Sequence, residues 1–105
     1  MTRVERSLPE AKAFIRDCVV LAEEGDDTVL DIRSHFRYRM RMRGLFWADV
    51  VAVLTDPLRI EDRGWDDEPR QRFWLHGEVP NIGEIRVVCS IDWDTRLITL
   101  NWDEP

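Results

Sequence analysis

The first quarter of the chain repeats hydrophobic residues at helical spacing. The repeating positions are Ala11, Phe14, Ile15, Cys18, Val19 and Ala22. Ser7 and Glu10 match the Ser-x-x-Glu capping box that opens many helices, and Gly25 is a suitable C-terminal stop. The pattern predicts a helix from about Leu8 to Glu24, whose apolar stripe must pack on a sheet or on another helix.

The next hydrophobic pattern has two interpretations. Thr28–Ile32 is short and rich in β-branched residues, which predicts a brief strand or an extended link. From Phe36 to Arg43, aromatic residues and methionines alternate strictly with arginines, and such alternation is typical of a strand. Arginine and methionine are nevertheless good helix formers, and Gly44 would end a helix well. The pattern alone favours a strand slightly and leaves the helix open.

The rest of the chain begins with one more helical pattern and continues with strands. Leu45–Leu54 has apolar residues at helical spacing, and Asp56-Pro57 ends the element. The hydrophobic period then changes to two in four segments, which are Leu58–Arg63, Arg72–His76, Ile85–Ile91 and Leu97–Trp102. Helices followed by strands predict an α+β fold, in which N-terminal helices pack on an antiparallel meander sheet of three to four strands.

Length and hydropathy limit the class of protein. The chain has 105 residues, so we expect residues 1–105 to form a single domain around one core. No apolar run approaches the roughly 20 residues that cross a bilayer, and the N-terminus shows no signal-peptide pattern. We therefore expect a cytoplasmic protein with no membrane partner, whose oligomeric state the sequence does not determine.

Cysteine spacing and motifs indicate no cofactor. Cys18 and Cys89 lie far apart among apolar neighbours, which predicts two buried, reduced thiols. Neither belongs to a Cys-x-x-Cys pair, and the chain has no glycine-rich phosphate loop. We interpret Asp92 and Asp94 as residues of a hairpin turn, and Asp66–Glu68 as a solvated loop, instead of metal ligands. We expect no cofactor and no metal.

Charge is unevenly distributed along the chain. The net charge is −6, yet an acid-free segment contains five arginines, which are Arg33, Arg37, Arg39, Arg41 and Arg43. Subtracting their +5 from −6 leaves −11 for the other residues. An acidic protein is a poor general binder of nucleic acid, because phosphate is repelled at long range. A local arginine patch can still bind phosphate, while the acidic remainder suits a basic partner.

The arginine-rich segment carries a motif that resembles a known family. Ser34–Leu45 fits Ser-His-x-x-x-Arg-Met-x-x-Arg-Gly-(Ile/Leu), the pattern of the bacterial domain of unknown function number 4258. The resemblance covers roughly Ile32 to Leu100, and it includes Arg72–Gly77 and Arg96–Thr99 in the strand region. It implies a helix for the alternating segment, against the pattern. It also divides the chain into an N-terminal helix extension, residues 1–27, and a family-like α+β core, residues 28–102.

The layout of this family is also similar to that of the RelE-like and BrnT-like toxins, which are small ribonucleases that pair with an antitoxin. On a helix, His35, Arg39 and Arg43 lie at i, i+4 and i+8 and share one ridge. The analogy implies that His35 transfers a proton and that Arg39 and Arg43 bind the scissile phosphate. Arg72, with His76 on the same strand face, would complete the site from the sheet. The candidate catalytic residues are therefore His35, Arg39, Arg43 and Arg72, and the implied partners are RNA and an antitoxin-like protein.

Two other hypotheses remain open. The chain could be a non-catalytic acidic module that binds a basic protein, or a structural domain whose motif supports folding. In either case His35 is a helix-start histidine bonded to backbone or to Asp31, and the arginines form a solvated face. RNA binding that is sensitive to salt and to Arg39 would favour the ribonuclease hypothesis.

Overall fold

The computed structural model describes residues 5–102, and its first element is a long helix. Helix α1 (Leu8–Glu23) begins with the predicted capping box. The Glu10 N–H donates to Ser7 Oγ over 3.3 Å, and the Ser7 N–H donates to Glu10 Oε1 over 3.0 Å. Gly25 follows with a φ of 112°, a conformation that costs glycine little. The predicted first helix is confirmed.

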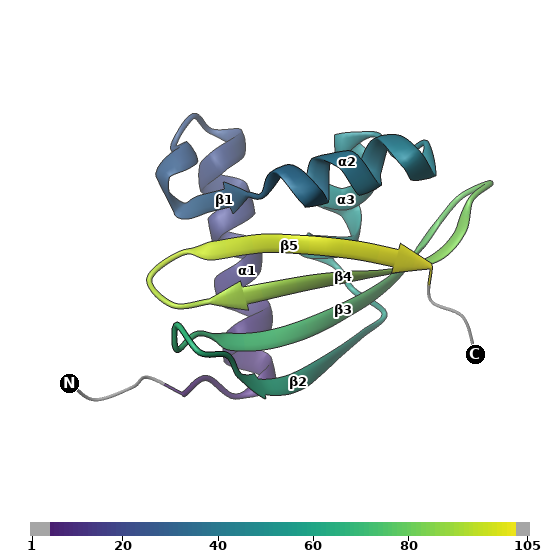
Figure 1. Cartoon of the computed structure of the whole chain (residues 1–105). Coiled ribbons are helices and arrows are strands. Elements are labelled where there is room, and N and C mark those ends of the chain that lie inside the picture. Colours follow the sequence, from purple (N-terminus) through teal and green to yellow (C-terminus); the bar gives the residue numbers. More distant parts are fainter. Residues whose placement is uncertain (1–4, 103–105) are drawn as a thin grey trace.

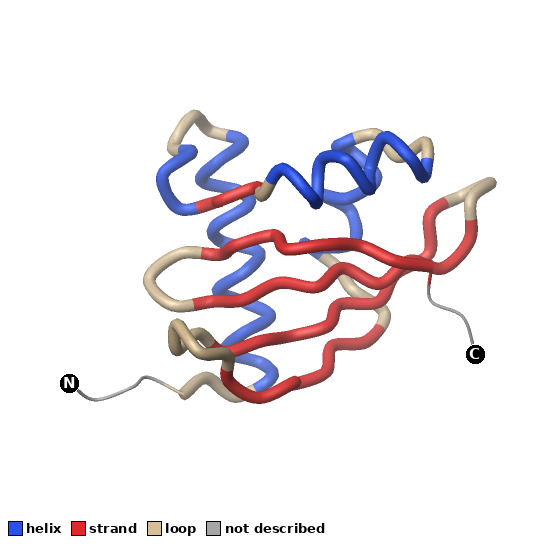
Figure 2. The backbone as a smooth tube through the Cα atoms, viewed as in Figure 1, coloured by secondary structure: helices blue, strands red, loops and turns tan. Residues whose placement is uncertain are grey.

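The other elements follow in the expected order, with helices ahead of the longer strands (Figure 2). A 3₁₀ turn and a short strand come first, which are η1 (Asp27–Val29) and β1 (Leu30–Ile32). Two helices come next, which are α2 (Ser34–Arg43) and α3 (Trp47–Thr55). Four strands complete the fold, which are β2 (Arg59–Trp65), β3 (Gln71–Val79), β4 (Gly83–Ile91) and β5 (Thr95–Trp102). Within residues 5–102, no helix combines the length and hydropathy needed to span a membrane.

The strands form one mixed sheet in the order β1-β5-β4-β3-β2. Strands β2 to β5 are the predicted antiparallel meander. The prediction of three to four antiparallel strands was wrong in number and in one direction, because β1 adds a fifth strand parallel to β5, with Leu30 opposite Thr95. A three-residue strand is too short for its pattern to show which strand it joins. The return of the chain from α1 lays β1 along the edge of β5 (Figure 1).

Helices α1 and α3 cover one face of the sheet, and the core lies between them and the strands (Figure 1). The α1 stripe predicted from the sequence contributes buried side chains to this layer, and the sheet contributes alternate residues of its central strands. These buried residues include Ala11, Ile15, Val19, Phe73, Leu75, Val87 and Leu97. Removing this apolar surface from water, at about 25 cal/mol per Å², is the main favourable contribution to folding.

Strand β3 approaches α3 most closely at Gly77. A Cβ atom placed on Gly77 would lie 2.6 Å from Cγ2 of Val53, far inside normal contact distance. Val53 is buried and β-branched, so it has few alternative rotamers. Glycine is therefore needed for the close packing of α3. It also explains why β3 continues to Val79, whereas the sequence pattern predicted that the strand ends at His76.

Helix α2 lies along the sheet edge, beside β5 and beyond the end of β1 (Figure 1). Phe36 is fully buried and Met40 packs against the core, while Tyr38 and Met42 face solvent. Gly44 ends the helix with a left-handed φ of 66°. The helix implied by the family resemblance is confirmed, and the strand favoured by alternation is wrong. Alternation misled because the apolar residues of this segment do not share one buried face.

A buried ion pair fastens the loop before β3 to the β4–β5 hairpin. Arg70 Nη2 lies 2.7 Å from Asp94 Oδ1, an ion pair without hydrogen-bond alignment. Arg70 Nε donates to Ser90 Oγ over 2.9 Å, and Nη2 donates to the Ser90 and Asp94 carbonyls over 3.2 Å each. Asp94 does lie at the hairpin turn, and in addition its carboxylate is buried against Arg70.

Both cysteines are buried and free of disulfide bonds, as predicted. Burial raises the pKa of the Cys89 thiol to about 12. Burial is also the main reason for the raised pKa of Cys18, and it outweighs hydrogen bonding to Thr95. Because the thiolate is the reactive form, both cysteines are expected to be inert at neutral pH.

Candidate functional site

Two of the four candidate residues line the same pocket. His35 is the second residue of α2 and Arg72 belongs to β3, and both contribute to a pocket of about 220 Å³. We call it the His35 pocket. Its other lining residues are Arg33, Asp66, Glu68, Arg96 and Ile98. The start of α2, the β2–β3 loop and two strands thus bring distant parts of the sequence together.

Two arginines at the His35 pocket are only loosely paired. Arg72 Nε lies 3.5 Å from Asp66 Oδ2, and Arg33 Nη1 lies 3.6 Å from Asp31 Oδ2. The side chains of Arg72 and Arg33 are 42% and 49% exposed. Solvent-exposed pairs of this kind contribute about 0–1 kcal/mol to stability. Both guanidinium groups can therefore exchange a carboxylate for a phosphate oxygen at little cost.

Arg96 is held more firmly than its neighbours. Its Nε lies 3.3 Å from Asp31 Oδ2, and its Nη1 donates to Glu68 Oε2. Burial alone would lower the pKa of Arg96, but the hydrogen bond to Glu68 and the nearby carboxylates outweigh burial and raise it. Arg96 therefore fixes the Glu68 carboxylate at the edge of the His35 pocket.

Asp66 organises the β2–β3 loop that forms one wall of the pocket. Its Oδ1 accepts the backbone N–H groups of Glu68 over 2.9 Å and of Arg70 over 2.7 Å. Burial acts to raise the pKa of Asp66, but these N–H groups and the Arg72 side chain together lower it below its ordinary value. Asp66 is therefore ionised at neutral pH, and it holds both the loop and Arg72 in place.

The other two candidate residues, Arg39 and Arg43, are not part of the pocket lining. Arg39 Nε donates to the Leu100 carbonyl over 3.1 Å, and Nη2 donates to Asn101 Oδ1. The Arg43 guanidinium carbon lies 4.9 Å from the centre of the Trp102 ring. These contacts cover the β5 edge beyond β1, where backbone groups would otherwise lack partners. Of the predicted ridge, His35 lies at the pocket and the two arginines reach β5.

His76, considered as a further member of the site, lies elsewhere in the sheet. It is buried in β3, and its Nε2 is 2.6 Å from Glu61 Oε2. The hydrogen bond with His76 is the main cause that lowers the pKa of Glu61. The interpretation of His76 as a hairpin-end residue was wrong, because β3 runs on to Val79.

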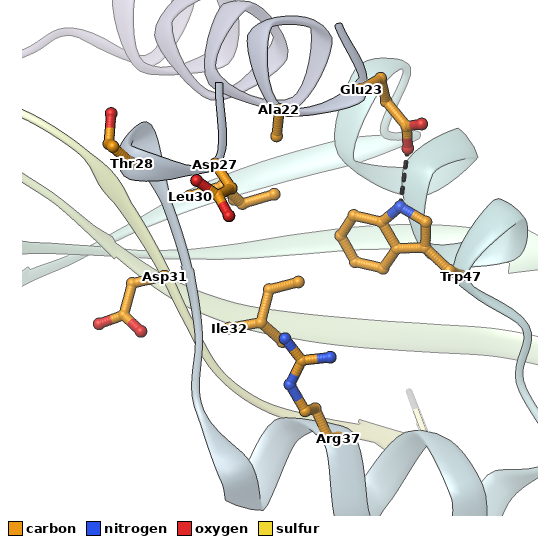
Figure 3. Close-up of a pocket in the computed structure, with 9 residues that line it drawn as sticks. All are labelled: Ala22, Glu23, Asp27, Thr28, Leu30, Asp31, Ile32, Arg37 and Trp47. Carbon is orange, nitrogen blue, oxygen red and sulfur yellow. Dashed lines mark hydrogen bonds between the residues drawn. The ribbon is translucent and has the colours of Figure 1, made fainter. Parts of the chain in front are cut away.

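A larger cleft, of about 500 Å³, opens between the end of α1, β1 and the start of α3 (Figure 3). We call it the Trp47 cleft. The Trp47 indole forms one wall, and its Nε1 donates to Glu23 Oε1 over 2.7 Å. Asp27 and Arg37 point into the cleft from opposite sides (Figure 3). With Asp31, the lining carries three carboxylates and one guanidinium, so the Trp47 cleft is acidic on balance.

Sequence reasoning missed four residues of the His35 pocket, which are Arg33, Asp66, Glu68 and Arg96. A short acidic loop has no periodicity that shows where it folds back onto the sheet. One available signal was Asp66 itself, since an aspartate often accepts the N–H two residues later and orders a turn. For Arg96, the alternation along β5 shows the strand face but not the partners on it.

The pocket and fold define a class: a small α+β protein with a charged pocket between a helix N-terminus and an antiparallel sheet. A family described as "Domain of unknown function (DUF4258)" matches residues 32–101. The chain therefore belongs to the DUF4258 family. No curated protein and no solved structure matches it. Across residues 5–102, no three His, Cys, Asp or Glu side chains are gathered in a way that could hold a metal ion.

Proposed function

We propose that this protein binds RNA and cleaves its backbone at the His35 pocket. The main supporting observation is that His35 and Arg72 line one pocket, although they come from a helix and a strand far apart in the sequence. A histidine beside loosely paired arginines combines a proton-transfer group with cations for phosphate. Few other arrangements of these side chains serve both requirements at once.

Cleavage of RNA by its own 2′-hydroxyl requires two proton transfers. The 2′ oxygen attacks phosphorus and loses its proton to a base, while the P–O5′ bond breaks and the 5′ oxygen receives a proton from an acid. In this proposal His35 and Glu68, which line the same pocket, are the two proton-transfer groups. The products are a 2′,3′-cyclic phosphate and a 5′-hydroxyl end.

Arg72 and Arg33 are the cations of the proposed site. They can turn from Asp66 and Asp31 to the phosphate oxygens, because both ion pairs are long and exposed. The N-terminus of α2 has no side-chain cap, so its partial positive charge adds to theirs beside His35. In this proposal Arg39 and Arg43 act as positioning residues, which fix α2 on β5.

The experiment is cleavage of a short fluorescent RNA at low salt by wild type and single variants. We expect His35→Ala to lower the rate by about 10²–10⁴, and Arg72→Ala to lower it by about 10². Arg41→Ala is the matched control, because Arg41 is exposed on the same helix outside the pocket. Its rate should remain close to wild type.

Three further measurements complete this test. A DNA strand of the same sequence should stay intact, since it lacks the 2′-hydroxyl. The salt slope should be about −0.7 for each phosphate contacted on a single strand. Thermal melts show whether each variant folds. Absence of RNA binding by wild type at low salt, or an equal loss of activity in Arg41→Ala, would contradict the proposal.

The Trp47 cleft supports a second candidate function, that of a non-catalytic module for a basic partner. Glu23, Asp27 and Asp31 line this cleft around an indole, and an indole also attracts cations. A lysine-rich peptide should then bind wild type, and Asp27→Asn should weaken it. Asp17→Asn, an exposed position on α1, is the control. Peptide binding without RNA binding would favour this second function.

A further inference from the structure

Helix α2 exposes a surface that the proposed RNA site does not use. Tyr38 and Met42 are 49% and 65% exposed, and as i, i+4 neighbours they lie side by side. Phe46, at the entry to α3, is 78% exposed. Exposed hydrophobic side chains that gather in one place, unlike scattered ones, mark interaction sites.

Two arginines without partners accompany these hydrophobic side chains. Arg37 and Arg41 are also i, i+4 neighbours, and both are exposed. Their side chains form no hydrogen bond, ion pair or ring contact with any residue from 5 to 102. The sequence has no acid between Asp31 and Asp49 that could balance them. The outer side of α2 therefore presents two unbalanced positive charges next to an apolar stripe.

We infer that Arg37, Tyr38, Arg41, Met42 and Phe46 form a docking surface for a helical segment of a partner protein, one with an apolar stripe flanked by aspartate or glutamate. An amphipathic helix buries its apolar stripe against the exposed hydrophobic side chains. Its carboxylates meet the two free guanidinium groups, and this charge match sets the orientation. RNA would satisfy the arginines but would leave Met42 and Phe46 in water, so an acidic protein segment fits this surface better.

The probe for this docking surface is a synthetic helical peptide of about 20 residues, long enough for several turns. It carries leucines at i, i+3, i+4 and i+7, with glutamates beside them. One matched peptide has lysine in place of glutamate, and another has serine in place of leucine. Binding to the full chain is followed by fluorescence anisotropy. We expect the glutamate–leucine peptide to bind at least about tenfold more tightly than either of the others.

Charge reversal on the protein tests the surface directly. Arg41→Glu should weaken the glutamate–leucine peptide by about tenfold. The double variant Arg37→Glu with Arg41→Glu should bind the lysine peptide more tightly than wild type does. Arg16→Glu is the matched control, because Arg16 is an exposed arginine on α1. It changes the net charge as Arg41→Glu does, and it should leave peptide binding unchanged.

Several outcomes would overturn the inference. Equal binding of the three peptides, or equal losses in Arg16→Glu and Arg41→Glu, would remove the docking surface. RNA binding that falls in Arg41→Glu, without any peptide binding, would assign the surface to nucleic acid. Light scattering that shows self-association, abolished by Met42→Ser, would make a second copy of the chain the occupant. Loss of RNA cleavage in His35→Ala is independent of these results, so the two proposals fail separately.

Discussion

Arg70 and Arg72 lie two residues apart, each paired with an aspartate, but their surroundings differ. Arg70 and Asp94 are both almost completely buried and 2.7 Å apart, with Ser90 accepting a further hydrogen bond. Arg72 lies 3.5 Å from Asp66 and is largely open to solvent. The same chemical pair therefore fastens the fold at one position and leaves a cation available to a ligand at the other.

Helix α2 repeats this contrast on its two sides. Arg39 and Arg43 reach β5, where they contact Leu100, Asn101 and Trp102. Arg37 and Arg41 extend into solvent without partners among the described residues. A run of arginines in a sequence thus combines structural and available cations, and only the packing separates them.

The largest effect is expected when the buried pair is broken. Arg70→Ala leaves the Asp94 carboxylate buried without its cation, which should lower the free energy of unfolding by about 3–5 kcal/mol. Arg72→Ala should lower it by no more than about 1 kcal/mol, because its pair is exposed. Urea denaturation of both variants measures the difference.

A double variant sharpens this result. Arg70→Met with Asp94→Leu removes both charges at once, so that no buried carboxylate remains unpaired. We expect it to be more stable than Arg70→Ala, because replacing both partners avoids the desolvation cost. If Arg70→Ala and Arg72→Ala lost equal stability, burial would not be what distinguishes the two arginines.

The two sides of α2 should differ by a smaller amount. Arg39→Ala removes charge-assisted hydrogen bonds to the Leu100 carbonyl and the Asn101 side chain, and should cost about 1–3 kcal/mol of unfolding free energy. Arg41→Ala should change the unfolding free energy by less than about 0.5 kcal/mol, since it touches nothing in the described chain. Thermal unfolding of the two variants makes the comparison. Similar melting temperatures for both would show that Arg39 does not secure the β5 edge.

Much of the fold could be predicted from local patterns. The capping box of Ser7 and Glu10 and the stripe that includes Ile15 fix α1, because both signals lie within a few turns of one helix. The period-two segments likewise predicted the meander. The parallel pairing of β1 could not be predicted, because a strand such as Leu30–Ile32 has too few residues to specify a distant partner.

The site was less predictable than the fold. The motif that resembles the family pointed to His35, and the structure puts His35 and Arg72 in one pocket. The sequence did not show that Arg39 bonds to β5, because helix spacing gives the face of a residue but not what lies against that face. The roles of Arg33 and Arg96 depend equally on tertiary packing.

The smallest effect is expected at Asp66, and it should depend on pH. Asp66 accepts the N–H groups of Glu68 and Arg70, and its pKa is lowered in the folded chain. A carboxylate with a lowered folded pKa stabilises the protein above its unfolded pKa of about 3.9, and this contribution disappears as pH falls through the folded pKa. Asp66→Asn should therefore cost about 0.5–1.5 kcal/mol at neutral pH, and the difference from wild type should shrink below about pH 4.

Urea denaturation of wild type and Asp66→Asn between neutral and acidic pH measures this dependence. Asp67→Asn, at the exposed next position, is the matched control and should follow wild type throughout. Because Asp66 also holds Arg72 loosely, its substitution should free that arginine and alter RNA binding more than it alters stability. A pH-independent difference would mean that the ionised carboxylate does not order the loop, and the pocket wall would then depend on Arg96 and Glu68 alone.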